Sequence, residues 1–242
     1  IPGDWSSANY FLAAAAIVPG RIKVKGLDMS AHGEAKFIDV LADMGCNINK
    51  NNDSIEIIGN KNLTAVDVDS GLIIWQLPTQ SNSIINETYN FKTSKLVSDG
   101  NSIFISNNKN EFYSIDVKTG TTNWINDIKS NITPVVTGNL IFTVSNEGYL
   151  YAIEKNKGNI IRVTDLFKIY KQKKRKNIYP IGFAIGNKNL YLTNSDGKLI
   201  VVDLQNGSII KTEKVSSNLV SKPFIYNNNL FLIRNGSIVR YN

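Results

Sequence analysis

Few side chains in this sequence are of the types that make or break covalent bonds, and they form no catalytic set. His32 is the only histidine, and its place between Ala and Gly in a polar stretch favours a loop or capping role over a general base. Ser6 and Ser7 have no neighbouring base that would activate a hydroxyl, so we expect them to cap and pack a helix. Cys46 is the only cysteine, which excludes an intramolecular disulfide, and its apolar surroundings predict a buried thiol. We predict no catalytic residue.

One stretch has oxygen ligands at alternate positions, as a calcium loop does. Asp67, Asp69 and Ser70 precede Gly71 in the sequence Asp-Val-Asp-Ser-Gly. A calcium loop also needs later ligands, including a distal bidentate Glu, and these are missing here. We therefore favour a turn over a metal site and predict neither a metal nor a cofactor.

A basic run is the strongest candidate for binding another molecule. Residues 168–176 carry six cations, within the longer segment Asp165–Pro180. Two interpretations are a solvated loop and a contact with an acidic protein or with anionic lipid head groups. We predict protein partners, at most peripheral membrane contact, and no nucleic acid, because an aromatic platform for bases is lacking. The interaction candidates are Lys171, Lys173, Lys174, Arg175 and Lys176.

Composition divides the chain into two parts. Ala occurs 8 times in residues 1–46 and 3 times afterwards, whereas Asn occurs once before residue 47 and 31 times from there on. This shift predicts a helical segment followed by turn-rich β structure. No apolar run reaches the roughly 18 residues that span a bilayer. Asp4 precedes the short apolar stretch Tyr10–Val18, which disfavours a signal peptide, and a first residue other than Met suggests a fragment.

The first part predicts a small α/β segment. We expect a helix over Ser7–Ile17 capped by Asp4 or Ser6, and a half-buried strand over Arg21–Gly26. A second helix over Glu34–Met44 is capped by Gly45. Two strands complete the order helix, strand, helix, strand, strand, and they are Cys46–Asn49 and Ser54–Ile58.

Three motifs in this part resemble enolpyruvylshikimate-phosphate synthase, the enolpyruvyl transferase of the shikimate pathway. They read GDWSSANYFLAAAAI, IKVKGLDM and HGEAKFIDVLADMG, and the resemblance covers residues 1–69. In that family the stretch is one αβ repeat of a two-domain enzyme. The family has Gln-Gly-Asp where this chain has His32-Gly-Glu, and its main substrate ligands come from other repeats. The resemblance therefore implies an inactive fragment.

The second part repeats a short β motif. Four segments align as LTAVDVDSGLIIW, FYSIDVKTGTTNW, LYAIEKNKGNIIR and LIVVDLQNGSIIK. Each has an apolar strand, an acid, three residues, a glycine and a second strand, which predicts a hairpin whose glycine adopts a positive φ. With a second hairpin before each, the unit becomes about four antiparallel strands, the size of a propeller blade. The acids are Asp67, Asp116, Glu154 and Asp203, and the glycines are Gly71, Gly120, Gly158 and Gly207.

Two tryptophans mark the edge of the predicted blades. Trp75 and Trp124 stand four residues after their glycines, where Arg162 and Lys211 stand in the later repeats. The pattern resembles the tryptophan-docking motif of quinoprotein-like (PQQ-repeat) propellers, in which the ring packs between blades, and we assign the rings to packing. Residues 62–242 are similar to this family, and within it to the outer-membrane barrel-assembly type. The resemblance implies assembly partners; the calcium ligands and catalytic acid of quinone dehydrogenases cannot be placed.

These patterns predict a mainly β chain, with a partial β-propeller of about four four-stranded blades after the α/β segment. We place the domains at 1–66 and 67–242, with a seam at Val66-Asp-Val-Asp69 that fits both families, and interpret the chain as chimeric. The predicted function is a non-enzymatic protein-interaction scaffold of the outer-membrane assembly type. The alternatives are an enolpyruvyl transferase of aromatic amino-acid biosynthesis and a quinone-dependent dehydrogenase. The propeller resemblance implies the periplasmic face of the outer membrane, and the transferase resemblance implies the cytoplasm.

Overall fold

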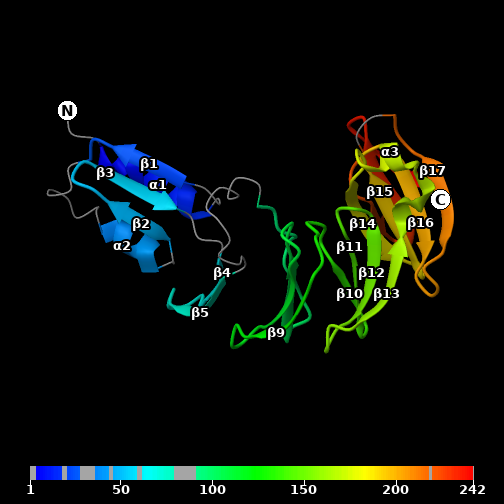
Figure 1. Ribbon diagram of the computed structural model, residues 1–242, viewed down its shortest axis with the longest axis horizontal. Helices are drawn as coiled ribbons and strands as arrows, with labels where there is room; N and C mark the ends of the chain where they lie inside the picture. The colour runs from blue at the N-terminus through cyan, green and yellow to red at the C-terminus, as the bar shows by residue number, and fades with distance from the viewer. Residues whose placement is uncertain are drawn as a thin grey trace. The chain divides into compact units, whose positions relative to one another are not determined.

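The computed structural model describes residues 4–17, 21–27, 36–43, 46–58, 62–78, 91–217 and 220–241 (Figure 1). The chain divides into two compact units, and each is described by itself. The first unit is Ile1–Phe91 with Thr119–Thr121, and the second is Lys92–Lys118 with Thr122–Asn242.

The first unit contains the predicted α/β segment. Its elements are α1 (Trp5–Ile17), β1 (Arg21–Lys25), α2 (Lys36–Asp43), β2 (Asn47–Lys50) and β3 (Ser54–Ile58). The three strands form an antiparallel sheet in the order β1-β3-β2. The predicted order of helix, strand, helix, strand, strand is therefore confirmed, with ends shifted by one or two residues. Gly45 and His32 lie outside the described residues.

Helix α1 begins where a cap and an apolar stripe coincide. Asp4 accepts hydrogen bonds from the amides of Ser6 and Ser7 at 3.0 and 3.2 Å and from the Ser7 hydroxyl at 2.6 Å, so Asp4 is the cap. The apolar stripe of α1 packs with α2 and the sheet in one core, in which Cys46 is also buried. Its buried residues in α1 are Trp5, Ala8, Leu12 and Ala15, at helical spacing.

The first unit also contains a separate two-stranded sheet. Strands β4 (Asn62–Val66) and β5 (Ile73–Pro78) pair as a hairpin. Strand β3, four residues before β4, pairs with β1 and β2 instead of β4. The change from one sheet to the next therefore falls between Ile58 and Asn62, just before the predicted seam.

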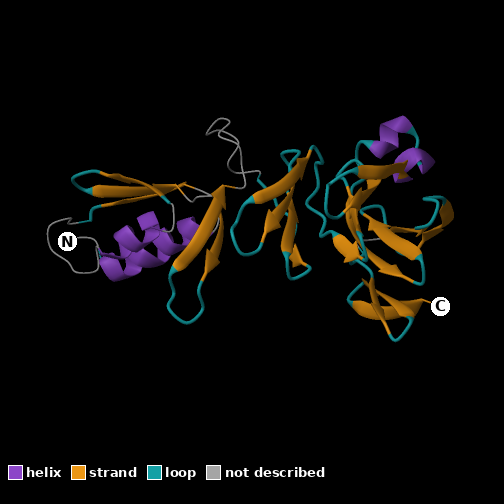
Figure 2. Ribbon diagram, turned by 90° about the horizontal axis from the view of Figure 1, so that it is seen from below, coloured by secondary structure: helices purple, strands orange, loops and turns teal. Residues whose placement is uncertain are grey.

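The second unit is a series of antiparallel sheets, each built from strands consecutive in sequence (Figures 1 and 2). The first sheet has β6 (Val97–Ser98), β7 (Ser102–Ser106), β8 (Phe112–Asp116) and β9 (Thr122–Asn126). The second has β10 (Val135–Thr137), β11 (Leu140–Val144), β12 (Tyr149–Glu154) and β13 (Ile160–Asp165). The third has β14 (Pro180–Gly186), β15 (Asn189–Asn194), β16 (Lys198–Asp203) and β17 (Ile209–Lys214). The last has three strands, β18 (Phe224–Tyr226), β19 (Asn229–Arg234) and β20 (Ser237–Tyr241).

Neighbouring sheets of the second unit share their hydrophobic cores. Phe104 of β7 and Phe112 of β8 pack with Ile141 of β11 and Ile153 of β12, and all four are fully buried. A second cluster joins the strands β11 and β12 to β15 and β16, and a third joins β16 to β19. Burial of both faces at each interface is the arrangement of propeller blades.

The predicted fold class is confirmed: the chain is mainly β, with blade-like sheets after an α/β segment. Three of the sheets have the predicted four strands, the sheet β18–β20 has three, and the sheet β4–β5, which holds the first repeat, has two. The described sheets do not form a closed ring. Within the described part of the chain, no helix has the length and apolar character needed to cross a bilayer.

Candidate functional site

The repeated acids and glycines lie in hairpin turns, as the spacing predicts. The Asp67 carboxylate accepts the Ser70 amide at 2.8 Å and the Ser70 hydroxyl at 2.6 Å, which lowers its pKa. Asp116 and Asp203 accept the amide two residues ahead at 2.9 and 2.6 Å. Glu154 instead accepts the Asn159 side-chain amide at 2.9 Å. The four turn glycines have φ between 70° and 78°, and they are Gly71, Gly120, Gly158 and Gly207.

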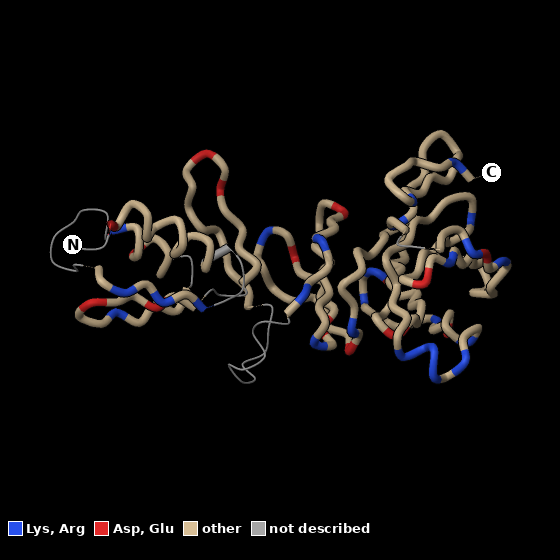
Figure 3. Tube along the Cα trace, turned by 90° about the horizontal axis from the view of Figure 1, so that it is seen from above, with Lys and Arg blue, Asp and Glu red and all other residues tan. Residues whose placement is uncertain are grey.

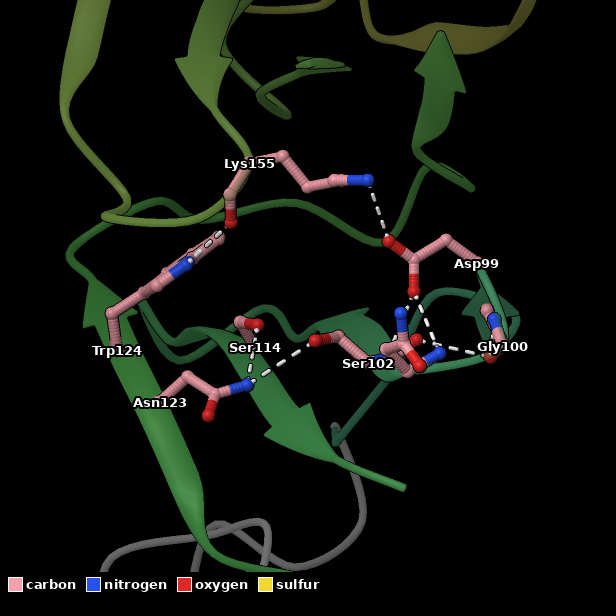
Figure 4. Close-up of polar contacts among 9 residues, drawn as sticks. Asp99, Gly100, Ser102, Ser114, Asn123, Trp124 and Lys155 are labelled. Atoms are coloured by element: carbon pink, nitrogen blue, oxygen red, sulfur yellow. Dashed lines mark hydrogen bonds and ion pairs between the residues drawn. The ribbon is translucent and has the colours of Figure 1, made fainter. Parts of the chain in front are cut away.

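Trp124 of the first four-stranded sheet contacts the turn between β12 and β13 of the second sheet (Figure 4). Its indole N–H donates to the Lys155 carbonyl at 2.9 Å. The ring lies so close to Gly158 that a Cβ there would come within 2.6 Å of it. Asn126 adds a bond from its side-chain amide to the Gly158 carbonyl at 2.8 Å. Gly158 therefore serves both the turn conformation and the close approach of the ring.

Lys155 makes a second contact across the same interface. Its ammonium lies 2.8 Å from the Asp99 carboxylate, and both side chains are largely buried, at 24% and 16% exposed (Figure 4). Asp99 also accepts the amide of Ser102 at 2.8 Å. The hydrogen bond from Lys155, followed by the one from the Ser102 amide, lowers the pKa of Asp99 to about 2.

The other docking positions keep this contact to different degrees. In the first unit, a Cβ on Gly120 would come within 2.5 Å of the Trp75 ring. In the second unit, Arg162 takes the place of a tryptophan. Its guanidinium donates to the carbonyls of Leu204 and Gln205 at 2.6 and 2.7 Å, and its Nε would lie 2.8 Å from a Cβ on Gly207.

Lys211, at the fourth docking position, pairs with Glu213 at 2.7 Å. It lines a hollow of about 560 Å³ between the sheets β14–β17 and β18–β20, together with Tyr191, Val201 and Tyr241. Docking at this position is thus replaced by an ion pair on the same strand.

The basic segment is anchored by its apolar residues. It forms η3 (Leu166–Ile169) and α3 (Gln172–Arg175), the two short helices of the second unit in Figure 2. Leu166 and Phe167 are fully buried, and Phe167 lies against Gly148, where a Cβ would come within 2.3 Å of its ring. Tyr170 packs edge-on against Phe167 at a centroid distance of 5.4 Å. The backbone of the segment is therefore fixed on the core.

Figure 3 shows the basic segment as a long run of blue along the trace. The five predicted interaction residues in it differ in their surroundings. The Arg175 guanidinium bonds to the Asp165 carboxylate at 2.7 Å and lies 5.1 Å from the Tyr149 ring centre. Lys174 lies 3.8 Å from the Asp196 carboxylate. Lys171, Lys173 and Lys176 are exposed. Within the part of the chain that the structure describes, none of these three has an ion-pair partner.

A repeated serine contact is not indicated by any motif in the sequence. Ser94 donates its amide to the Ser106 carbonyl at 2.8 Å and accepts the Ser106 amide with its hydroxyl at 3.0 Å. Ser221 repeats this pair of bonds with Ile233 at 2.9 Å each. In both cases the serine and its strand partner are twelve residues apart. This spacing has no apolar pattern from which it could be predicted.

The few reactive side chains of the first part make structural contacts where the structure describes them. Ser6 and Ser7 bond to Asp4, and Cys46 is buried in the α/β core. His32 lies outside the described residues. Within the described residues, no three His, Cys, Asp or Glu side chains gather as metal ligands would.

Two family models match the chain, and their ranges overlap. Residues 1–81 match the model of EPSP synthase (3-phosphoshikimate 1-carboxyvinyltransferase). Residues 51–164 match the model of the outer membrane protein assembly factor BamB. Each match covers less than half of the chain. Both predicted resemblances are confirmed, and residues 51–81 are common to the two matches.

Curated transferases match the first part of the chain. The 3-phosphoshikimate 1-carboxyvinyltransferase of Methanococcoides burtonii is 44% identical over 81 residues, which is 33% of this chain and 19% of the relative. That of Shewanella piezotolerans is 51% identical over 70 residues, 28% of this chain and 16% of the relative. The chain thus spans less than a fifth of the length of these relatives.

A solved structure shares the fold of the second part. The β-propeller domain of Cps50 (Swd1) from Myceliophteria thermophila superposes with a TM-score of 0.55 at 11% identity. The match covers 75% of this chain and 59% of the other. It shows a propeller-like fold alone.

Proposed function

We propose that this chain is a non-enzymatic scaffold that binds proteins, of the outer-membrane assembly type. The observation that supports it best is the stack of blades joined at their turns by Trp124 and Arg162. This stack includes most of the range that matches the BamB model. Its repeated residues are used for turns and packing, which leaves blade edges and the basic segment for partners.

Strand addition is the mechanism that the edges favour. Among the described strands, the last strand of each four-stranded sheet, β9, β13 or β17, has a neighbour on one side only. An edge strand offers backbone amides and carbonyls that an extended partner can pair with. The exposed lysines of the basic segment add attraction for acidic partners.

Calorimetric titration tests this function. The full chain is titrated into a purified outer-membrane barrel-assembly complex that lacks its own propeller subunit. The proposal expects saturable binding at one site per complex and competition by the native propeller subunit. Absence of binding heat, with the chain still folded by circular dichroism, overturns it.

Enolpyruvyl transfer is the second candidate, because the match to the transferases reaches 44% identity over 81 residues. That candidate needs ligands for phosphoenolpyruvate and shikimate phosphate within this chain. Release of inorganic phosphate from these two substrates separates it from the first candidate.

We also propose that the chain joins two ancestries near residues 66–69. The overlap of the two family matches over residues 51–81 supports a junction in this range. The domain boundary at 66/67 belongs to the same proposal. A single long DNA read across codons 60–72 tests it: one uninterrupted reading frame supports a fusion in the genome, and two separate loci indicate an artefact of assembly.

A further inference from the structure

Strand β13 shares with β9 and β17 a register shift toward its inner neighbour, but it differs from them in the apolar side chains that it exposes. Ile160, Ile161 and Val163 are 44%, 61% and 49% exposed. Its one cation, Arg162, is used by the contact with Leu204 and Gln205. Edge strands are normally blunted by exposed charges, above all lysine. Within the described residues, β13 has no neighbour on its outer side.

The other two outer strands are less open to a partner. Strand β17 carries Lys211, Glu213 and Lys214 around its exposed Ile210. Strand β9 has one exposed apolar residue, Ile125 at 55%, between Trp124 and Asn126. An incoming strand gains most from a row of apolar side chains on one face, because cross-strand pairs stabilise the added strand. The exposed Ile161 and Val163, on either side of Arg162, supply apolar side chains of this kind, and the ladder to β12 shifts its register beside Ile161.

At Val163, the backbone amide and carbonyl of β13 point away from β12. Leu166, the residue after β13, donates its amide to the carbonyl of Gly148, the residue before β12, at 3.0 Å. The backbone polar groups of Leu166 therefore point toward the β12 side. In an antiparallel pair, alternate residues direct their amide and carbonyl to the same side. With Val163 opposite Tyr151 in the register, the polar groups of Val163 therefore face away from β12.

The basic segment is fixed at the C-terminal end of the same strand. Asp165, the last residue of β13, accepts the Phe167 amide at 3.0 Å and the Arg175 guanidinium at 2.7 Å. Arg175 also lies over Tyr149, the partner of Asp165 on β12. Helix α3 is thereby held beside this end of the strand. The exposed lysines that lack an ion pair among the described residues are Lys171, Lys173 and Lys176.

We propose that β13 is the docking edge for an extended acidic peptide of a protein partner, which adds as a fifth, antiparallel strand. An antiparallel strand begins where β13 ends, so the acidic residues of the partner precede its apolar stretch and meet Lys171, Lys173 and Lys176. The apolar stretch alternates, with residues two apart beside Ile161 and Val163. This inference rests on the proposed scaffold function and names its partner class.

Fluorescence polarisation with the full chain tests the proposal. The probe is a labelled peptide, Asp-Glu-Asp-Gly-Val-Thr-Val-Thr-Val, and the reference is a peptide with the acidic residues moved to its C-terminal end. We expect saturable binding of the probe, weaker binding of the reference by about tenfold, and weakening with salt, because the ion pairs are exposed. Absence of saturation by about 1 mM chain overturns the proposal.

Matched variants locate the site. Val163→Pro removes an outward amide and leaves the ladder to β12 intact, so probe binding falls at least about tenfold. Ile125→Lys, on the outer strand β9, changes it less than about twofold. A probe N-methylated at alternate amides loses binding to the unmodified chain, which keeps the test independent of the folding of any variant. Equal binding by the methylated probe overturns strand addition.

Charge reversal and vesicles distinguish the peptide from a membrane. Lys171→Glu, Lys173→Glu and Lys176→Glu together lower probe affinity at least about tenfold. If vesicles of phosphatidylglycerol and phosphatidylcholine bind the chain and the peptide does not, the basic segment is a lipid site and the proposal fails. If the peptide fails while the barrel-assembly complex still binds, the scaffold function stands and the edge β13 is wrong.

Discussion

At the scale of single residues, Lys155 and Gly158 show how one turn joins two sheets. Lys155 accepts the Trp124 indole with its carbonyl and pairs with Asp99 through its ammonium. Gly158 has no Cβ, which leaves space for the Trp124 ring. The sequence predicts the glycine and the tryptophan, because both recur at fixed offsets. It does not predict the Asp99–Lys155 pair, because Asp99 lies outside the aligned motif and Lys155 stands at a position that varies among its copies. The contact also depends on how the sheets stack.

The Asp99–Lys155 pair makes the free energy of unfolding depend on pH in the acid range. The pKa of Asp99 is lowered from 3.8 to about 2, so the folded state binds its proton less readily than the unfolded chain. The stabilisation is present above pH 4 and is lost as the pH falls from 4 to 2. We expect Asp99→Asn to cost about 1–2 kcal/mol at pH 7 and to flatten this part of the profile. Urea unfolding from pH 2 to 7 measures it, with Asp127→Asn as the exposed control.

Gly158 tests the ring contact apart from the turn conformation. Gly158→Ala places a methyl group 2.6 Å from Trp124 at φ 74°, whereas Gly138→Ala has φ 57° and nothing within 4 Å. We expect a loss of about 3 kcal/mol in unfolding free energy for Gly158→Ala and about 1 kcal/mol for Gly138→Ala. Equal losses in denaturant titrations would mean that the ring contact contributes little.

At the scale of elements, the repeat is easier to predict than the contacts between its copies. Period-two apolar patterns and turn glycines predict the hairpins, because local backbone chemistry determines them. From the sequence alone, Arg162 is interpreted as a position where the docking tryptophan has been lost. In the structure its guanidinium bonds the same turn through two carbonyls. The buried anchors Leu166 and Phe167 are equally hard to predict, because they stand at the start of a segment whose composition is dominated by cations.

Variants of Arg162 test whether the third docking position works as the second does. Arg162→Ala leaves the carbonyls of Leu204 and Gln205 without these donors, and we expect a loss of about 2–3 kcal/mol. Arg162→Trp restores a ring and one donor, so its loss should stay below about 1 kcal/mol. Thermal unfolding of the two variants compares them. A tryptophan that destabilises as much as alanine would contradict the equivalence of the positions.

At the scale of the whole molecule, the chain combines a match to an enzyme with a match to an assembly factor. The α/β segment is under a fifth of the length of the transferases it matches. The sequence predicts both resemblances and the fold class, because each has its own residue pattern. The partner cannot be predicted in this way, because an edge strand is recognised through its backbone, which any sequence shares.

The account depends most on the claim that this chain binds and does not catalyse. The direct measurement is phosphate release by the purified chain with phosphoenolpyruvate and shikimate 3-phosphate, beside a full-length transferase as the positive control. We predict no release above the rate without protein, because the chain matches less than a fifth of the length of the transferases. Turnover that follows the concentration of the chain and needs both substrates would contradict the account.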